Sequence, residues 1–241
     1  MRFVLLVGML VTVVLATHPL WAYEVVPVAD GGVLAGKIVF RGTPPEPKKV
    51  LISKDIEVCG AGHRERRDVE VAADGGLTQV VVSIEGVSRG KAWPTESFIL
   101  DQRGCAFRPY LQVVRNGAEL VILNSDPMLH NIHTYELIGG AKRTLFNVAQ
   151  PKFKPKVVQT IKVSRGKAIR VECDAHDFML GWIAVSDHPY VSLVGENGAF
   201  EIADVPPGTY KVRAWHPFLG EQVQEVTIPA QGRASVTLEF K

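Results

Sequence analysis

Three side chains that could hold a metal ion lie close together in the stretch ECDAHDFMLGW: Cys173, His176 and Met179. A thiolate, an imidazole and a thioether form a soft donor set, and soft sulfur donors favour copper or other thiophilic metals over magnesium or calcium. A mononuclear blue-copper centre needs two imidazoles and a thiolate in a near-trigonal plane, with a weak axial methionine. One more histidine must therefore come from elsewhere, and the upstream stretch NSDPMLHNIHTY supplies it.

Strand patterns flank both stretches. The alternating run AIRVEC leads into Cys173 and GWIAV resumes a strand at Gly181, so the intervening DAHDFML is expected to be a short loop. The strand ELVILN ends at Asn124 and turns through SDP before His130. Loops cluster at the poles of an antiparallel sandwich, so the two stretches are predicted to meet there. His133, three residues beyond His130 on a strand, points to the opposite face and is expected in the core or on the surface.

Short strands separated by turn residues fill the rest of the chain, and the sequence shows no convincing helical period. The chain is therefore predicted to be all-β. The stretches RNGA and SRGK are expected to be hairpin turns, because Asn116, Gly117 and Gly166 adopt positive φ at low cost. The predicted strands are GKIVF, TQVVVSIEG, ESFILD, YLQVVRNGAELVILN, VVQTIKVSRGKAIRVEC, GWIAVSD, GAFEIAD, GTYKVRAW, QEVTIPA and ASVTLEF.

The central motifs resemble those of a cupredoxin. The tight C-x2-H-x2-M loop looks like the amicyanin variant rather than the longer plastocyanin loop, and HNIH after a proline-containing turn is similar to the family's first-ligand motif. The resemblance implies a Greek-key sandwich that holds one copper ion, cycling between Cu(I) and Cu(II), through His130, Cys173, His176 and Met179. It also implies that Asn131 ties the two ligand loops together.

Two positions depart from the family pattern. Family members usually carry proline immediately before each ligand histidine, whereas this chain has Leu129 and Ala175 there. These residues are expected to loosen the loops and to alter the potential or the metal selectivity without removing a ligand. Zinc or Cu(I) would also suit the donor set. A buried free cysteine beside an unremarkable histidine and methionine is the alternative interpretation.

A second resemblance covers the two ends of the chain. GGVLAGKIVFRGTPP near the start, and GENGAF followed by DVPPGTY near the end, look like parts of the transthyretin-like sandwich known as the carboxypeptidase regulatory-like domain. The expected organisation is a discontinuous domain of residues 23–91 and 188–241, with a cupredoxin domain, residues 92–187, inserted into it. Two independent flanking pieces are the alternative. The whole chain resembles periplasmic proteins often labelled methylamine utilization or plastocyanin-like proteins.

Residues 1–22 have the charged, apolar, small-residue order of a secretory signal peptide, with an uncleaved anchor as the alternative. A periplasmic or secreted location is therefore predicted. Of the three cysteines, at most two can pair, and Cys173 already has neighbours that explain it. A disulfide between Cys59 and Cys105 is predicted, which an oxidising compartment permits, and two free buried thiols are the alternative.

Composition excludes several functions. The formal net charge of +2 is too small to indicate nucleic-acid binding, and no basic stripe interleaved with aromatic residues is present. No stretch after residue 22 is apolar enough to span a membrane. The charged stretch GHRERRD is expected to be a solvated loop, with His63 on its surface and Arg64, Arg66 and Arg67 as a docking patch in the alternative.

The favoured function is one-electron transfer to a redox partner protein such as a cytochrome or a dehydrogenase. The expected exit path is the imidazole edge of His176, framed by an apolar rim of Pro127, Met128, Leu129, Phe178 and Leu180. Copper binding or delivery, and a cell-surface β-module with a structural metal, are the alternatives. No enzyme class is indicated, because a methionine completes the loop and no nucleophile-elbow or phosphate-binding motif accompanies it.

Overall fold

The structure, a computed structural model, describes residues 23–95 and 97–241. The predicted signal peptide, residues 1–22, lies outside the described residues. The regular structure of the described chain is almost entirely β-strand, with a single short helix, α1 (Ile56–Cys59), so the all-β prediction is confirmed. No helix in this part of the chain has the length and hydropathy needed to cross a bilayer.

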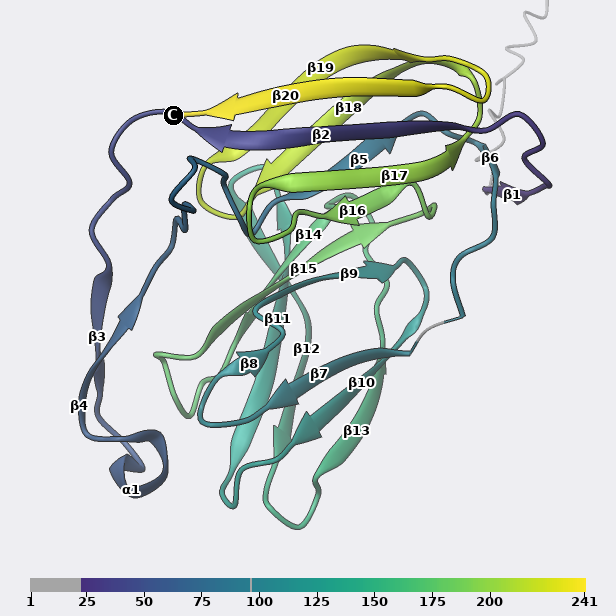
Figure 1. The fold of residues 1–241 in the computed structure, drawn as a ribbon. Helices are drawn as coiled ribbons and strands as arrows, with labels where there is room; N and C mark the ends of the chain where they lie inside the picture. The colour runs from purple at the N-terminus through teal and green to yellow at the C-terminus, as the bar shows by residue number, and fades with distance from the viewer. Residues whose placement is uncertain (1–22, 96) are drawn as a thin grey trace, which may run out of the picture.

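The central region forms two facing sheets that enclose one apolar core (Figure 1). Alternation builds this core: along the strand ELVILN, Leu120 and Ile122 are buried between more accessible neighbours. One sheet has the order β13 (Lys156–Thr160), β10 (Glu119–Asn124), β7 (Phe98–Gln102) and β8 (Phe107–Arg108). The other has the order β12 (Ala141–Gln150), β11 (His130–Ile138), β14 (Ala168–Glu172), β15 (Leu180–Ser186) and β9 (Leu111–Arg115).

The two ends of the chain build a second pair of sheets around a separate core. One sheet has the order β16 (Val191–Leu193), β5 (Val81–Glu85), β18 (Gly208–His216) and β19 (Gly220–Ile228), and the other β17 (Ala199–Val205), β2 (Gly32–Phe40) and β20 (Arg233–Phe240). Since β2 pairs with both β17 and β20, segments about 160 to 200 residues apart share one sheet. This pairing is what a discontinuous domain requires. The proposed boundaries and the transthyretin-like character stay predictions.

The two sandwiches pack against each other through β15 and the sheet that contains β5 and β18. Trp182 of β15 lies edge-on to Trp215 of β18, with ring centroids 6.2 Å apart, and Val81 completes the contact. The strand LGWIAVS is therefore buried on both faces, which explains why it has no alternation of polar and apolar residues. A two-residue parallel pair, β1 (Glu24–Val25) with β6 (Arg89–Gly90), lies in the segments that lead into and out of the second sandwich.

A two-stranded ribbon lies outside both sandwiches (Figure 1). It consists of β3 (Lys48–Ile52), α1 and β4 (Gly62–Arg66). The predicted disulfide between Cys59 and Cys105 is confirmed, and it joins the ribbon to the central sandwich. The prediction that GHRERRD is a solvated loop is therefore wrong in part: β4 is a strand, although His63 is exposed as expected. Contacts with the central core, and not a local apolar pattern, place this segment.

The two predicted hairpin turns are turns of another kind. RNGA connects β9 to β10 and SRGK connects β13 to β14, and in each case the two strands belong to different sheets. Gly117 has the expected positive φ of 81°. Gly166 does not have a positive φ. A glycine is needed at position 166 because a Cβ atom would lie 2.2 Å from the carbonyl oxygen of Leu137.

A buried carboxylate fixes the strand that carries His130. Glu136 of β11 is fully buried, and its Oε1 accepts hydrogen bonds from the backbone N–H groups of Ser164, Arg165 and Gly166 at 2.6–2.9 Å. The guanidinium of Arg143 donates to the other oxygen. Burial by itself would raise the pKa of Glu136, but the hydrogen bonds from Arg165, Arg143, Gly166 and Ser164 outweigh it and lower this pKa to about 2. The ionised carboxylate therefore stabilises the fold.

Replacing Glu136 by glutamine should lower the free energy of unfolding by about 2–3 kcal/mol at pH 7. Because the pKa of Glu136 is depressed in the folded state, the wild-type advantage is complete above about pH 4.5 and is lost as the pH falls toward 2. Denaturant titrations at several pH values measure this difference. Glu119→Gln, at an exposed position on β10, is the control and should change little. Parallel pH profiles for Glu136→Gln and the wild type would contradict the assignment.

Candidate metal centre

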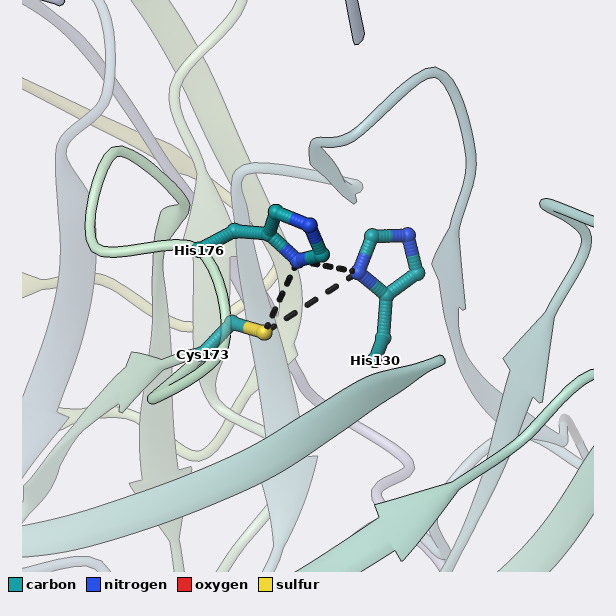
Figure 2. Close-up of side chains that lie close together, drawn as sticks. All are labelled: His130, Cys173 and His176. Carbon is teal, nitrogen blue, oxygen red and sulfur yellow. Dashed lines mark hydrogen bonds between the residues drawn. The ribbon is translucent and has the colours of Figure 1, made fainter. Parts of the chain in front are cut away.

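Three donor atoms converge at one pole of the central sandwich. His130 begins β11, Cys173 follows β14, and His176 lies in the loop that leads to β15. The two Nδ1 atoms are 3.0 Å apart, and Sγ of Cys173 lies 3.6 Å from Nδ1 of His176 and 3.9 Å from Nδ1 of His130 (Figure 2). All three side chains are buried. The structure thus brings together three of the four predicted ligands, whose role as ligands stays a prediction.

Two local backbone hydrogen bonds hold the loop DAHDFML in a tight conformation. The backbone N–H of His176 donates to the carbonyl of Cys173 at 3.2 Å, and that of Met179 donates to the carbonyl of His176 at 2.9 Å. Met179, the fourth predicted ligand, is 2% exposed and belongs to the same apolar cluster as Cys173 and Phe178. The loop therefore turns all of its donor residues inward.

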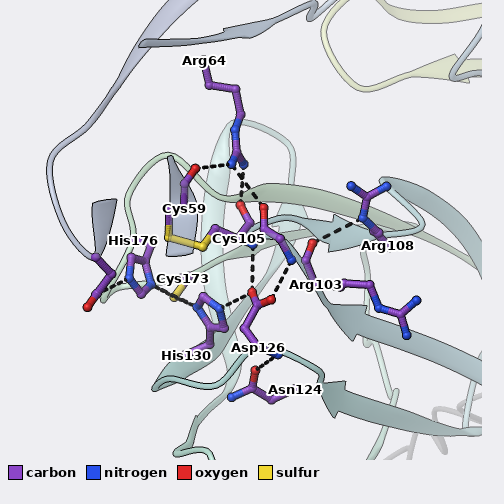
Figure 3. The surroundings of a disulfide bond; sticks show 12 residues. Cys59, Arg64, Arg103, Cys105, Arg108, Asn124, Asp126, His130, Cys173 and His176 are labelled. Atoms are coloured by element: carbon purple, nitrogen blue, oxygen red, sulfur yellow. Dashed lines mark hydrogen bonds and ion pairs between the residues drawn. A yellow bond between two sulfur atoms is a disulfide. The ribbon is translucent and has the colours of Figure 1, made fainter. Parts of the chain in front are cut away.

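A carboxylate supports each histidine from behind. Nε2 of His130 lies 2.9 Å from Oδ2 of Asp126 (Figure 3). Nε2 of His176 lies 2.8 Å from Oδ2 of Asp55. Histidines that bind metals usually donate their remaining ring N–H to a carboxylate or a carbonyl, which fixes the tautomer and the ring orientation. Both rings therefore have a partner that leaves Nδ1 free to bind an ion.

Asp126 is itself held as an anion. The backbone N–H groups of Gly104 and Cys105 donate to its two oxygens at 2.7 and 2.8 Å. Burial raises the pKa of Asp126, but the hydrogen bonds from Cys105, Gly104 and His130 outweigh this effect and lower it. Burial also lowers the pKa of His130, mainly by desolvating the charged ring, so this imidazole is neutral and able to donate a lone pair.

This arrangement fits one metal ion. If each Nε2–H donates to its carboxylate, the two Nδ1 lone pairs face each other at 3.0 Å, a contact that becomes favourable when a metal ion or one added proton lies between them. Nitrogen and sulfur donors lie about 2.0–2.3 Å from a bound zinc ion, so donors on one such ion are at most about 4–5 Å apart. The observed separations of 3.0–3.9 Å satisfy this limit. Burial raises the pKa of the Cys173 thiol because it disfavours the charged thiolate, and a bound cation would offset this cost of burying the charge.

Asn131 joins the two ligand loops, as the cupredoxin resemblance implies. Its Oδ1 accepts hydrogen bonds from the backbone N–H of Ala175 at 3.1 Å and from the thiol of Cys173 at 3.4 Å. The backbone N–H of Asn131 in turn donates to Sγ of Cys173 at 3.4 Å. Ala175 stands where the family usually has proline, which has no N–H to donate. The departure from the pattern thus adds a hydrogen bond to the loop.

The expected exit path at His176 is wrong. The imidazole edge is not open, since the His176 side chain is 1% exposed and its Nε2 faces Asp55. Phe178 and Leu180 of the expected rim are buried as well, whereas Leu129 is 48% exposed. The physical reason is the ribbon, which lies over this side of the pole and which the sequence analysis did not place there.

His133 lies outside the donor group, as expected. It contacts Asp174, Thr144 and Asn147 on the outer side of the sheet. A second group of donors, formed by Cys105, Asp126 and His130, shares His130 with the candidate site. Because the sulfur of Cys105 is bound in the disulfide, this group offers no thiolate.

Sequence reasoning missed both supporting carboxylates. Asp126 lies four residues before His130 in the quoted motif, and its position was a signal that could have been used. Asp55 is 121 residues away from His176, and no local pattern connects them.

Replacing Asn131 by alanine should lower the free energy of unfolding of the metal-free protein by about 1–3 kcal/mol, because the N–H of Ala175 loses its partner. Chemical denaturation measures this change. Asn197→Ala is the control, since Oδ1 of Asn197 accepts a comparable hydrogen bond from the N–H of Ala199 at the exposed surface, where its loss should cost less. Equal costs for the two variants would mean that Asn131 is not the main link between the loops.

Comparisons with known proteins find only partial similarity at low identity. No family model matches the chain, and no curated protein matches it. Solved structures that resemble it include amicyanin from Paracoccus versutus, with 15% identity over 39% of this chain and 84% of that chain and a TM-score of 0.31. A purple cupredoxin from Nitrosopumilus maritimus has 16% identity over 37% of this chain and 100% of that chain, with a TM-score of 0.31.

A Cu-containing nitrite reductase from Thermus scotoductus has 16% identity over 40% of this chain and 24% of its own, with a TM-score of 0.30. Identities and TM-scores this low assign neither a ligand nor an activity to this chain. Its function has to be inferred from the site itself.

Proposed function

We propose that this chain is an exported mononuclear copper protein that transfers single electrons. Its proposed ligands are His130, Cys173, His176 and Met179. One observation carries the proposal: two imidazole nitrogens and a thiol sulfur lie within 4.8 Å of one another in a buried site, and each imidazole is backed by a carboxylate. A soft donor set of this composition suits copper.

Copper would supply a one-electron Cu(II)/Cu(I) couple. The chain itself would supply rigidly held ligands and a site from which water is excluded. Asp126 and Asp55 fix the two rings, Asn131 fixes the thiolate loop, and the apolar cluster that includes Phe178 excludes water. Ligand orientation and hydrogen bonding around the sulfur tune the potential of such a site.

Export and a redox partner belong to the same proposal. The Cys59–Cys105 disulfide supports an oxidising compartment, in agreement with a periplasmic or secreted location. Pro127 and Leu129 are exposed beside the site and suit a small, transient docking contact. Four exposed lysines in or next to β13 would add attraction toward an acidic partner such as a cytochrome or a dehydrogenase: Lys152, Lys154, Lys156 and Lys162. No catalytic residue is assigned.

Copper binding for delivery is the alternative that one observation favours. The ribbon that covers His176 shares no sheet with either sandwich, so its displacement would open the site without breaking a sheet. Rapid, reversible voltammetry of the loaded protein supports electron transfer, whereas ready transfer of Cu(I) to an acceptor protein supports delivery. The third interpretation, a cell-surface β-module with a structural metal, requires the metal-free protein to be unfolded or strongly destabilised.

With Cu(II), the purified protein should show an intense visible thiolate-to-copper charge-transfer band, and Cys173→Ser should abolish it because the thiolate is lost. Absorption spectroscopy measures the band. His133→Ala is the matched control, since His133 lies outside the donor group and the variant should keep the band. A colourless wild-type protein that takes up Cu(II) without the band would overturn the proposal.

Met179→Leu tests the fourth ligand. Leucine keeps most of the volume in the apolar cluster, so the fold should be retained. The charge-transfer band should persist, and the reduction potential measured by voltammetry should rise, because a lost donor weakens the oxidised ion more than the reduced one. Leu180→Met, at a buried neighbouring position, controls for packing. An unchanged potential in Met179→Leu would remove Met179 from the ligand set.

A further inference from the structure

The ribbon of β3, α1 and β4 belongs to neither pair of sheets. It is nevertheless attached firmly to the pole of the central sandwich where His130, Cys173 and His176 meet, called the metal pole below. The disulfide from Cys59 to Cys105 is one attachment. Arg64 provides another, since its guanidinium donates to the carbonyls of Cys105, Cys59 and Gly104 at 2.6, 3.1 and 3.2 Å and lies 5.7 Å from the ring centroid of Phe178. The ribbon is therefore a built cover and not a loose excursion of the chain.

The tip of this cover carries Asp55. The carbonyl of Asp55 accepts hydrogen bonds from the N–H groups of Val58 and Cys59, so its backbone is fixed to the half-cystine by one helical turn. Its φ of 49° is left-handed, a conformation that aspartate adopts more readily than most residues. The side chain is about half exposed, at 51%, while the His176 side chain that it contacts is 1% exposed. Asp55 thus stands between the ring and the solvent.

The disulfide also links the segments that carry the supports of the two histidines, and Figure 3 shows its Cys105 end beside Asp126. On one side, the N–H of Cys105 donates to Asp126, which contacts His130. On the other side, Cys59 ends the turn that begins at Asp55, which contacts His176. One covalent bond therefore restrains the separation of Asp55 and Asp126, and through these carboxylates the relative orientation of the two imidazole rings.

We propose that Asp55 is a positioning residue that the disulfide-tethered ribbon holds against Nε2 of His176, so that it orients this ring and closes the imidazole edge to solvent. The role of Asp55 in metal binding rests on the proposed copper site. The contact between Asp55 and His176 is present in the chain itself and can be tested without a metal. Exchange of an ion, or contact of a partner with the ring, then requires the tip of the ribbon to move.

Asp55→Gly is the decisive variant, because glycine removes the carboxylate while accepting the left-handed backbone without strain. In the metal-free protein, the ring of His176 should react with diethyl pyrocarbonate at least about tenfold faster than in the wild type, since a local closing contact is gone. Peptide mass spectrometry measures the reaction, and exposed His63 provides an internal reference. Asp55→Asn keeps an oxygen acceptor and should restore most of the protection.

A second readout reports the orientation of the ring itself. In the metal-free wild type, 15N NMR should show His176 with its proton on Nε2, whereas Asp55→Gly should populate both tautomers. In the copper-loaded protein, the metal affinity of Asp55→Gly should fall about 10–100-fold, as for other partners of metal-binding histidines. Glu57→Gln removes the same charge from an exposed position two residues away and should behave as the wild type.

The outcomes separate the two proposals. Wild-type reactivity and an unchanged tautomer in Asp55→Gly would overturn the role of Asp55, whatever the protein does with copper. A wild-type protein that takes up no copper would overturn the proposed function, while the metal-free measurements would still decide whether Asp55 closes the edge. A paired Cys59→Ala, Cys105→Ala variant should expose His176 like Asp55→Gly, and full protection in it would show that the tether is not needed.

Discussion

The site depends on the need for positive charge between His130 and His176. Two ring nitrogens lie 3.0 Å apart, each in a ring whose other nitrogen faces a carboxylate, and this contact is favourable only when a metal ion or one added proton lies between them. A buried sulfur lies within 4 Å of both. Three donors from two distant stretches of the chain thus converge on one point whose electrostatics call for a cation, and the supporting residues serve to maintain that convergence.

Much of the fold can be understood as support for this pole. Glu136 anchors β11, the strand that begins with His130, through hydrogen bonds to the connection between β13 and β14. Strand β15 resumes directly after the ligand loop and is held on both faces, by the central core on one side and by Trp215 of the second sandwich on the other. The ligand loop therefore runs between two strands that cannot shift independently of the cores.

The ribbon changes how the site communicates with its surroundings. An imidazole edge open to solvent would let a partner approach within contact distance of a ligand. Here Asp55 and Arg64 occupy that approach, and they do so through a segment that is covalently joined to the metal pole. Access is thus set by a small segment that belongs to neither pair of sheets and is held by the disulfide, by Arg64 and by the packing of Ile52 on the central core.

The sequence by itself determined the all-β class and most strands, because these follow from period-two alternation. It also indicated the candidate donor residues, through the chemistry of cysteine, histidine and methionine at short spacing and through the cupredoxin resemblance, and it favoured the disulfide through an odd cysteine count. Only the tertiary structure decided which strands share a sheet. RNGA and SRGK looked like hairpin turns, but pairing depends on contacts between distant strands, and these stretches connect different sheets. Asp55 could not be predicted either, since the ribbon has no apolar pattern of its own and is positioned by a disulfide and by hydrogen bonds to residues more than 40 positions away.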